Sequence, residues 1–519
     1  MKTKHHIIVA LALLALSTLS PQLSTAFAQG SLTPPPGVPG PTMITLSQIE
    51  PRTPISSAPY SITQPGSYYL TTNLTVTVGN VISISANGVT VNLNGFTIST
   101  TGSGSYGIFL FGSEGYGIGN TDITISNGHI MGGFTGGISY NVTGGTPHNI
   151  RVTGVTVTGG YYGIYLGIEN STVVESCTVN AVAGYGIQAS SVSHSTAIHC
   201  GSTAIVADTA SDCYAYSTGS DGLVAVYAAN NCYGNSDSEG GIYVFSGNAI
   251  NCYGNSNGGG QGLYAAGSAE NCYGNSFSGI GLNSGGSAEN CYGISGSGSG
   301  IYVYLGNAIN CYGISSGGGY GLYAVGSANS CYGNSTGGDG LYAVGSAENC
   351  YGVSSTGTGL FANTANNCGG TSSSGTGLNA DYTATGCYGT SGGLDGLDVA
   401  TAINCYGYCT GSGSGIVANN ANNCYGYCTG SGAGIVANNA NNCYGQSSSD
   451  ALFASGLSAY VANNCSGYDT NSFGIVVGSG AIGCYGDGPV GSVGIEIYLA
   501  NSCYSSSGDA KIVNKYNMP

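Results

Sequence analysis

One four-residue phrase holds most of the side chains in this sequence that could do chemistry. Asn-Cys-Tyr-Gly recurs along the chain, and most neighbouring copies lie 18 to 20 residues apart, with one gap of 22. Full copies contain Cys232, Cys252, Cys272, Cys291, Cys311, Cys350, Cys405, Cys424 and Cys443, and looser copies contain Cys213, Cys331, Cys368, Cys387, Cys465, Cys484 and Cys503. Thiols at such regular spacing can form disulfides, bind a soft metal or pack as small apolar side chains.

Tyrosines form two regular series of their own. The first follows the repeated cysteine, and the second lies in a Gly-Leu/Ile-x-small phrase that keeps step with it until Phe361, with Asn283 as an interruption. Rows of aromatic rings either stabilise a sheet by stacking or bind a flat ligand such as a sugar or a partner surface. The candidate binding residues are Tyr243, Tyr264, Tyr302, Tyr323 and Tyr342 of the second series and Tyr253, Tyr273 and Tyr292 of the first.

Acidic residues offer little support for catalysis. Glu270 and Glu289 occupy equivalent places in two copies of Gly-Ser-Ala-Glu-Asn-Cys, and the phrase returns at Glu348. Glycoside hydrolysis needs two carboxyls ~5–5.5 Å apart for retention or ~6.5–9.5 Å apart for inversion. Adjacent strands would bring this pair to about 5 Å, but on an exposed face that repeats. We therefore assign no catalytic residue, no metal site and no cofactor, and the pair His194 and His199 is a weak metal candidate.

The elements that position these residues follow from the repeat. A period of about 20 residues, with short apolar pieces between Gly, Ser and Asn, is typical of a solenoid. The Gly-Leu/Ile landmarks from Gly107 to Gly494 predict about 20 rungs and a rod on the order of 100 Å long. No segment of the array has helical periodicity. The sequence predicts an all-β, right-handed parallel β-helix.

Side-chain directions can be read from the early copies that lack cysteine. Val155 and Val157 alternate with polar residues, and aligning Cys177 on Val155 makes the repeated cysteine point inward and the next tyrosine outward. The asparagine before cysteine breaks the alternation, so we place it at a left-handed bend where stacked amides can bond.

The inward cysteines have three possible roles. Stacked Cβ atoms on parallel strands lie ~4.8 Å apart, farther than the ~3.8 Å of a disulfide, which favours core packing. Disulfides between adjacent rungs and a metal–thiolate chain remain alternatives. Cys409 and Cys428 form the pair most expected to differ, and Cys200 falls outside the ladder spacing.

Three N-terminal segments carry a family resemblance. Glu50–Ile55, Pro65–Leu70 and Val89–Ile98 resemble the opening of exported bacterial right-handed parallel β-helix proteins with the pectin-lyase-like fold. The resemblance covers residues 40–210 by motif and implies polysaccharide lyases and hydrolases among the relatives. A lyase of that type needs a calcium-binding carboxylate cluster and a basic Arg or Lys. Because residues 152–510 contain neither Arg nor Lys, the sequence argues against lyase chemistry.

Composition and the chain ends set the organisation. Residues 1–28 are typical of a signal peptide, with Lys2 and Lys4 before the apolar run Ile7–Leu16 and a final Ala26-Phe27-Ala28. We expect a Pro-rich linker at 29–54, an N-terminal β segment capping the solenoid at 55–100, the β-helix at 101–508 and a tail or cap at 509–519. The net charge of −16 disfavours nucleic acid as a partner, and no later segment is apolar enough to span a membrane.

These features together favour a non-catalytic exported protein. It would act outside the cell, at the cell surface or in the periplasm as a structural or binding element, adhesin-like or glycan-binding, with a polysaccharide or a surface protein as partner. The alternative is a carbohydrate-active enzyme, a hydrolase or lyase of the same fold. A passive spacer without a ligand is a third possibility.

Overall fold

The computed structural model describes residues 50–112, 118–143, 145–449, 451, 454–489, 494–506 and 510–516. The chain divides into two units, Met1–Pro51 and Arg52–Pro519. The predicted signal peptide and most of the predicted linker lie outside the described residues. The second unit is a parallel β-solenoid of about 23 turns, without helix in its described part. The prediction of a parallel β-helix is confirmed, and the extra turns precede Gly107, where the Gly-Leu landmark is absent.

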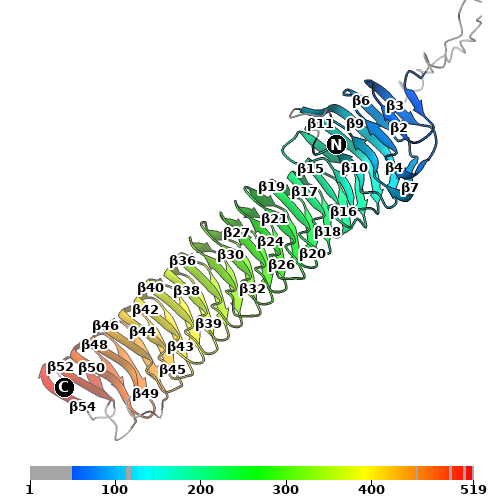
Figure 1. Cartoon of the computed structure of the whole chain (residues 1–519). Coiled ribbons are helices and arrows are strands. Elements are labelled where there is room, and N and C mark those ends of the chain that lie inside the picture. Colours follow the sequence, from blue (N-terminus) through cyan, green and yellow to red (C-terminus); the bar gives the residue numbers. More distant parts are fainter. Residues whose placement is uncertain are drawn as a thin grey trace, which may run out of the picture. The chain divides into compact units, whose positions relative to one another are not determined.

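Each regular turn contributes three short strands. In one turn these are β26 (Tyr273–Ser276), β27 (Leu282–Ser284) and β28 (Ala288–Glu289). Every strand pairs in parallel with its counterpart one turn later, so Tyr273 lies beside Tyr292 and Leu282 beside Ile301. The solenoid therefore has three parallel faces, which we name the Tyr-Gly face, the Leu face and the Ala face after the first residues of these three strands. Figure 1 shows the turns stacked along one axis.

The N-terminal strands belong to the same ladders. β1 (Thr53–Ile55) pairs with β3 (Gly66–Leu70), which pairs with β6 (Val89–Asn92), which pairs with β9 (Ile118–Met131). These turns bury large aliphatic side chains such as Leu70 and Leu93. At the other end, β54 (Ala510–Tyr516) pairs in parallel with β52 (Ile495–Asn501).

Burial follows the predicted alternation. In β26 the tyrosine and asparagine are half-buried, while Gly274 and Ser276 are fully inside. The cysteine before each of these strands is at most 3% exposed, and the Ala and Leu positions complete the core. Sequence reasoning missed the serine column, whose hydroxyls reach turn carbonyls of the preceding rung, as from Ser276 to Gly260 at 2.7 Å.

Glycine is required where the Tyr-Gly and Leu faces meet. A Cβ on Gly274 would collide with the carbonyl oxygen of Gly281, and a Cβ on Gly281 would collide with the backbone of Ile294. The glycines of the two repeated phrases thus interlock and allow the two backbones to pack directly.

The residue before the cysteine forms a bend, as predicted. Asn271, Asn290 and Asn310 each have φ of 52°. The Asn310 amide donates to Asn290 Oδ1 at 3.2 Å, and Asn290 donates to Asn271 Oδ1 at 3.2 Å. These bonds form part of a polar ladder along one edge of the solenoid.

Candidate binding surface

The second tyrosine series forms a continuous column on the Leu face. Its strands are β21 (Ile242–Val244), β24 (Leu263–Ala265), β27, β30 (Ile301–Val303), β33 (Leu322–Ala324), β36 (Leu341–Glu348) and β38 (Leu360–Asn366). Register places Tyr243, Tyr264, Asn283, Tyr302, Tyr323, Tyr342 and Phe361 directly beside one another. We call this column the aromatic stripe.

Its rings stack on one another. Centroids lie 4.3 Å apart between Tyr243 and Tyr264, 4.5 Å between Tyr302 and Tyr323, and 4.4 Å between Tyr342 and Phe361. All of these rings are half-buried. The stripe therefore presents ring edges and partial faces to solvent.

Two further aromatic side chains extend the stripe sideways. Phe245 and Tyr304, at the corners after β21 and β30, are 55% and 57% exposed, and their centroids lie 4.5 Å from Tyr243 and 6.4 Å from Tyr302. Sequence reasoning missed them because corner positions vary along the repeat. The signal was present, since each lies two residues after a tyrosine of the stripe.

The first tyrosine series lies on a different face. Tyr253, Tyr273 and Tyr292 belong to an unbroken stack on the Tyr-Gly face, with centroids 4.5 Å and 5.2 Å apart. They are also half-buried. The eight predicted binding residues thus separate into two surfaces, and a single ligand on one face contacts only one group.

A groove begins where the aromatic stripe ends. Beyond Phe361 the same register position is taken by Asn379, Asp398, Val417 and Val436. Their smaller side chains leave a groove of about 480 Å³. Inward Ala418 and Ala437 are 8% and 7% exposed there, whereas the equivalent Ala265 under the stripe is 0% exposed. The inward alanines form the floor of the groove, and they are partly exposed because no aromatic ring covers them.

Aspartates flank the Leu face on one side. Asp221, Asp339 and Asp395 share one turn position, each just before a Gly-Leu pair. Each carboxylate accepts a backbone N–H of the next rung, from Gly240 at 2.8 Å, Thr358 at 2.6 Å and Ser414 at 2.7 Å. Burial raises the pKa of all three carboxyl groups above their usual value.

The groove adds two more carboxyl groups. Asp398 and Asp381 both line it. Burial, followed by the nearby charge of Asp395, raises the pKa of Asp398. Burial and then neighbouring tyrosines, Asp339 and Asp381 raise the pKa of Tyr342. Asp381 and Asp398 come from successive rungs and line the groove together, while Asp395 lies close enough to Asp398 for its charge to act on that carboxyl.

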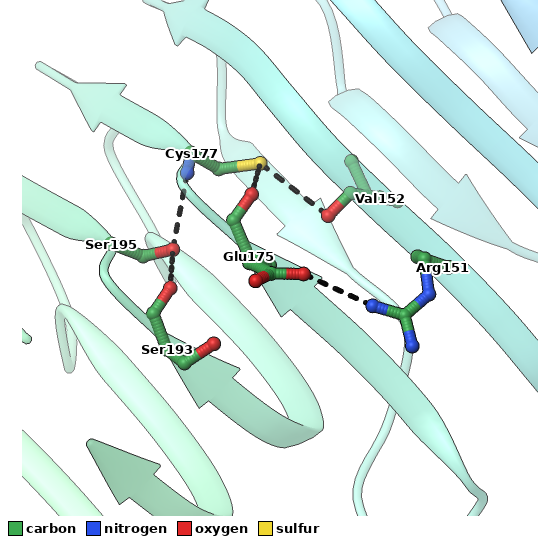
Figure 2. A network of polar contacts seen from close by, with 6 residues as sticks. All are labelled: Arg151, Val152, Glu175, Cys177, Ser193 and Ser195. Carbon is green, nitrogen blue, oxygen red and sulfur yellow. Dashed lines mark hydrogen bonds and ion pairs between the residues drawn. The ribbon is translucent and has the colours of Figure 1, made fainter. Parts of the chain in front are cut away.

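The cysteine column begins near the N-terminal third. Figure 2 shows Cys177 donating from Sγ to the Glu175 carbonyl at 3.3 Å and from its backbone N–H to Ser195 Oγ at 3.1 Å. Ser195 occupies the cysteine position of the following turn and donates to the Ser193 carbonyl at 2.8 Å. Nearby, Arg151 forms an exposed ion pair with Glu175 at 3.0 Å.

All twenty cysteines lie among the described residues, and all are buried and unpaired. Burial raises the pKa of Cys177 to about 11 and that of Cys200 to about 12. Cys409 and Cys428 are register partners, and they occupy the serine column together with Cys200. The described residues contain no group of three His, Cys, Asp or Glu that could hold a metal ion.

The remaining chemical candidates are dispersed. Glu270 and Glu289 are register partners on the Ala face, as expected, and both are exposed. His194 and His199 occupy separate bends with φ of 49° and 54°; His194 lies 3.7 Å from Asp212, and His199 lies 3.1 Å from Asn180. The structure does not bring these two histidines to a common site.

No protein-family model matches this chain, and no curated protein matches it. Within its described residues, the protein has no helix of the length and apolarity needed to cross a membrane.

Proposed function

We propose that this protein is an exported, non-catalytic parallel β-helix that binds polysaccharide through the aromatic stripe. The observation that carries this proposal is the half-exposed column from Tyr243 to Phe361, which ends in an open polar groove. Aromatic rings supply the apolar faces of sugars with contact area, and nearby amides and carboxylates supply hydrogen-bond partners. The resemblance to exported β-helix proteins and the predicted signal peptide support a location outside the cytoplasm.

The uniform repeat supports binding without turnover. Tyr323 and Tyr342 lie in identical Gly-Leu-Tyr-Ala-Val-Gly-Ser-Ala segments of successive rungs. The surface therefore offers a ligand equivalent positions along its length. Multiple weak contacts of this kind give avidity for a long repeating ligand. A surface protein with a complementary apolar face is the other partner that this column suits.

Binding is tested with a glycan array and the triple variant Tyr264→Ser, Tyr323→Ser and Tyr342→Ser. We expect the variant to lose binding while its circular dichroism spectrum matches the wild type, because each ring projects outward from the core. The matched control replaces Tyr253, Tyr273 and Tyr292 with Ser on the Tyr-Gly face and should retain binding. Equal binding by both triple variants would contradict the proposal.

One observation favours the enzymatic alternative. Asp395 and Asp398 carry carboxyl groups of raised pKa beside the groove, and a hydrolase uses such a carboxyl as its general acid. A reducing-sugar assay on the purified protein separates the two functions. Release of sugar that is lost in Asp398→Asn would replace a binding role with hydrolysis.

A further inference from the structure

The groove beyond Phe361 differs chemically from the stripe that leads to it. Four consecutive rungs replace aromatic rings with Asn379, Asp398, Val417 and Val436 in unbroken register. A ligand lying along the stripe therefore passes from ring edges into a hollow lined by carboxylate and amide groups and by small aliphatic side chains. Asn419 and Asn438 form its corner side, joined by a 3.0 Å hydrogen bond between their amides.

Charge in this region is of one sign. Asp381 and Asp398 face the groove, and Asp395 adds charge next to Asp398. No Lys or Arg occurs between residues 152 and 510. Among the described residues, no hydrogen-bond donor or cation engages the carboxylates of Asp381 and Asp398, so both are available to a ligand. Asp395, by contrast, is held by the Ser414 N–H.

We propose that the groove selects an amino sugar with a free ammonium group, as a subsite at the end of the aromatic stripe. This inference rests on the proposed polysaccharide binding and narrows its ligand class. Asp398 is half-buried and Asp381 is exposed, and both carboxylates can accept charge-assisted hydrogen bonds from an ammonium and repel a uronic acid.

A saccharide fits better than a basic peptide for a geometric reason. The stripe repeats similar rings in one line, and the amides of Asn379, Asn419 and Asn438 line the groove that follows it. Ring-shaped units bearing hydroxyl groups match both halves of such a surface. A lysine side chain would need only one cluster of acceptors around its ammonium group. The groove offers no regular row of hydrogen-bonding groups that would match a peptide backbone.

The test measures binding by calorimetry at one fixed, physiological salt concentration. Probes are the β-1,4-linked hexamers of glucosamine and of N-acetylglucosamine, together with hexalysine and oligogalacturonate. The key variant carries Asp381→Asn and Asp398→Asn. Its matched control carries Glu270→Gln and Glu289→Gln, which removes the same charge from the exposed Ala face.

We expect the glucosamine hexamer to bind the wild type more tightly than the acetylated hexamer does. The Asp variant should lose about tenfold of that affinity, as expected when charge-assisted hydrogen bonds to the ammonium are removed, and should bind the acetylated hexamer as before. The Glu control should behave as wild type, and oligogalacturonate should not bind.

Four results would overturn the inference. If the Glu control loses as much affinity as the Asp variant, the attraction is only general charge. If hexalysine binds as tightly with the same dependence on Asp381 and Asp398, the site is for basic peptide. If the acetylated hexamer binds and the glucosamine hexamer binds no better, the inference fails while the proposed function stands. If neither hexamer binds, the inference fails, and the glycan array decides the proposed function separately.

Discussion

Single residues at the bends show how closely side-chain type follows backbone conformation. Asn290 has φ of 52°, and the same column accepts Gly386 and Gly483 with φ of 61° and 63°. Asparagine tolerates this conformation, and its side-chain amide also forms a hydrogen bond with each neighbouring rung. Glycine supplies conformational freedom alone. The sequence was sufficient to predict this role, because asparagine interrupts the alternation at a fixed place.

Replacing Asn290 separates these two contributions. Asn290→Ala should lower stability by about 1–2 kcal/mol, the cost of a left-handed residue with a Cβ. Asn290→Gly should cost less, because it loses only the exposed side-chain hydrogen bonds to Asn271 and Asn310. The urea midpoint of each variant measures the effect, and a glycine variant weaker than the alanine variant would contradict this account.

The cysteines make a second residue-scale prediction. Because every thiol is buried, the sulfur atoms are inaccessible to an alkylating reagent in the folded protein. Iodoacetamide at pH 8 should leave native protein unmodified and add twenty groups after unfolding without reductant, by intact mass. Fewer than twenty adducts in the unfolded sample would indicate the disulfide alternative.

Two residue classes could not be predicted from the sequence. Ser276 and its equivalents are buried although serine is usually exposed, because each hydroxyl bonds to a turn carbonyl that only folding brings near. Asp381 and Asp398 line one groove only because successive rungs stack, so the sequence does not show that they share a site. Both cases depend on contacts across rungs, which a linear pattern does not report.

At the scale of strands, close backbone packing explains why glycine is retained. Gly274 of β26 and Gly281 before β27 occupy columns in which a Cβ would strike a carbonyl of the facing segment. The sequence indicated room for packing inside but not that two glycine columns contact each other. That contact sets the distance between the Tyr-Gly and Leu faces.

Gly274→Ala tests the interlock. We expect a loss of about 1–3 kcal/mol or more, because the added methyl group meets backbone atoms that cannot rotate away. Gly318→Ala is the matched control, since nothing lies within 4 Å of a Cβ at that position, and it should be neutral or slightly stabilising. Equal midpoints in urea for both variants would show that the two faces can separate without cost.

Across the whole solenoid, regularity made the fold predictable and left function open. Each rung repeats the same inward residues, so the period, the faces and the burial of Cys272 followed from the sequence. The candidate site arises where the repeat changes, from Phe361 to Asp398, and the consequence of a change depends on neighbours one turn away. That is why the stripe was identified and the groove was not.

The same regularity predicts an unusual pH profile. Burial raises the pKa of Cys177 from 9.0 to about 11 and raises the pKa of Tyr273 above 10.0, so the native state holds these protons more tightly than the unfolded chain. Their stabilisation is complete below pH 9 and is lost as the pH rises toward 11. The raised pKa of Asp395 likewise means stability that is present below 3.8 and lost as the pH rises above it.

Acid should therefore stabilise this protein, and alkali should unfold it. Lowering the pH also reduces the net charge of −16 and its self-repulsion, and the exposed ion pair of Arg151 and Glu175 contributes too little to reverse the trend. We expect the urea midpoint to fall from pH 3.5 to 7 and to fall steeply above pH 9. A variant with Asp221, Asp339 and Asp395 changed to Asn should show a smaller change between pH 3.5 and 7, because it lacks three of the groups that titrate there. Unfolding at pH 3.5 combined with full stability at pH 10.5 would contradict the burial of these groups.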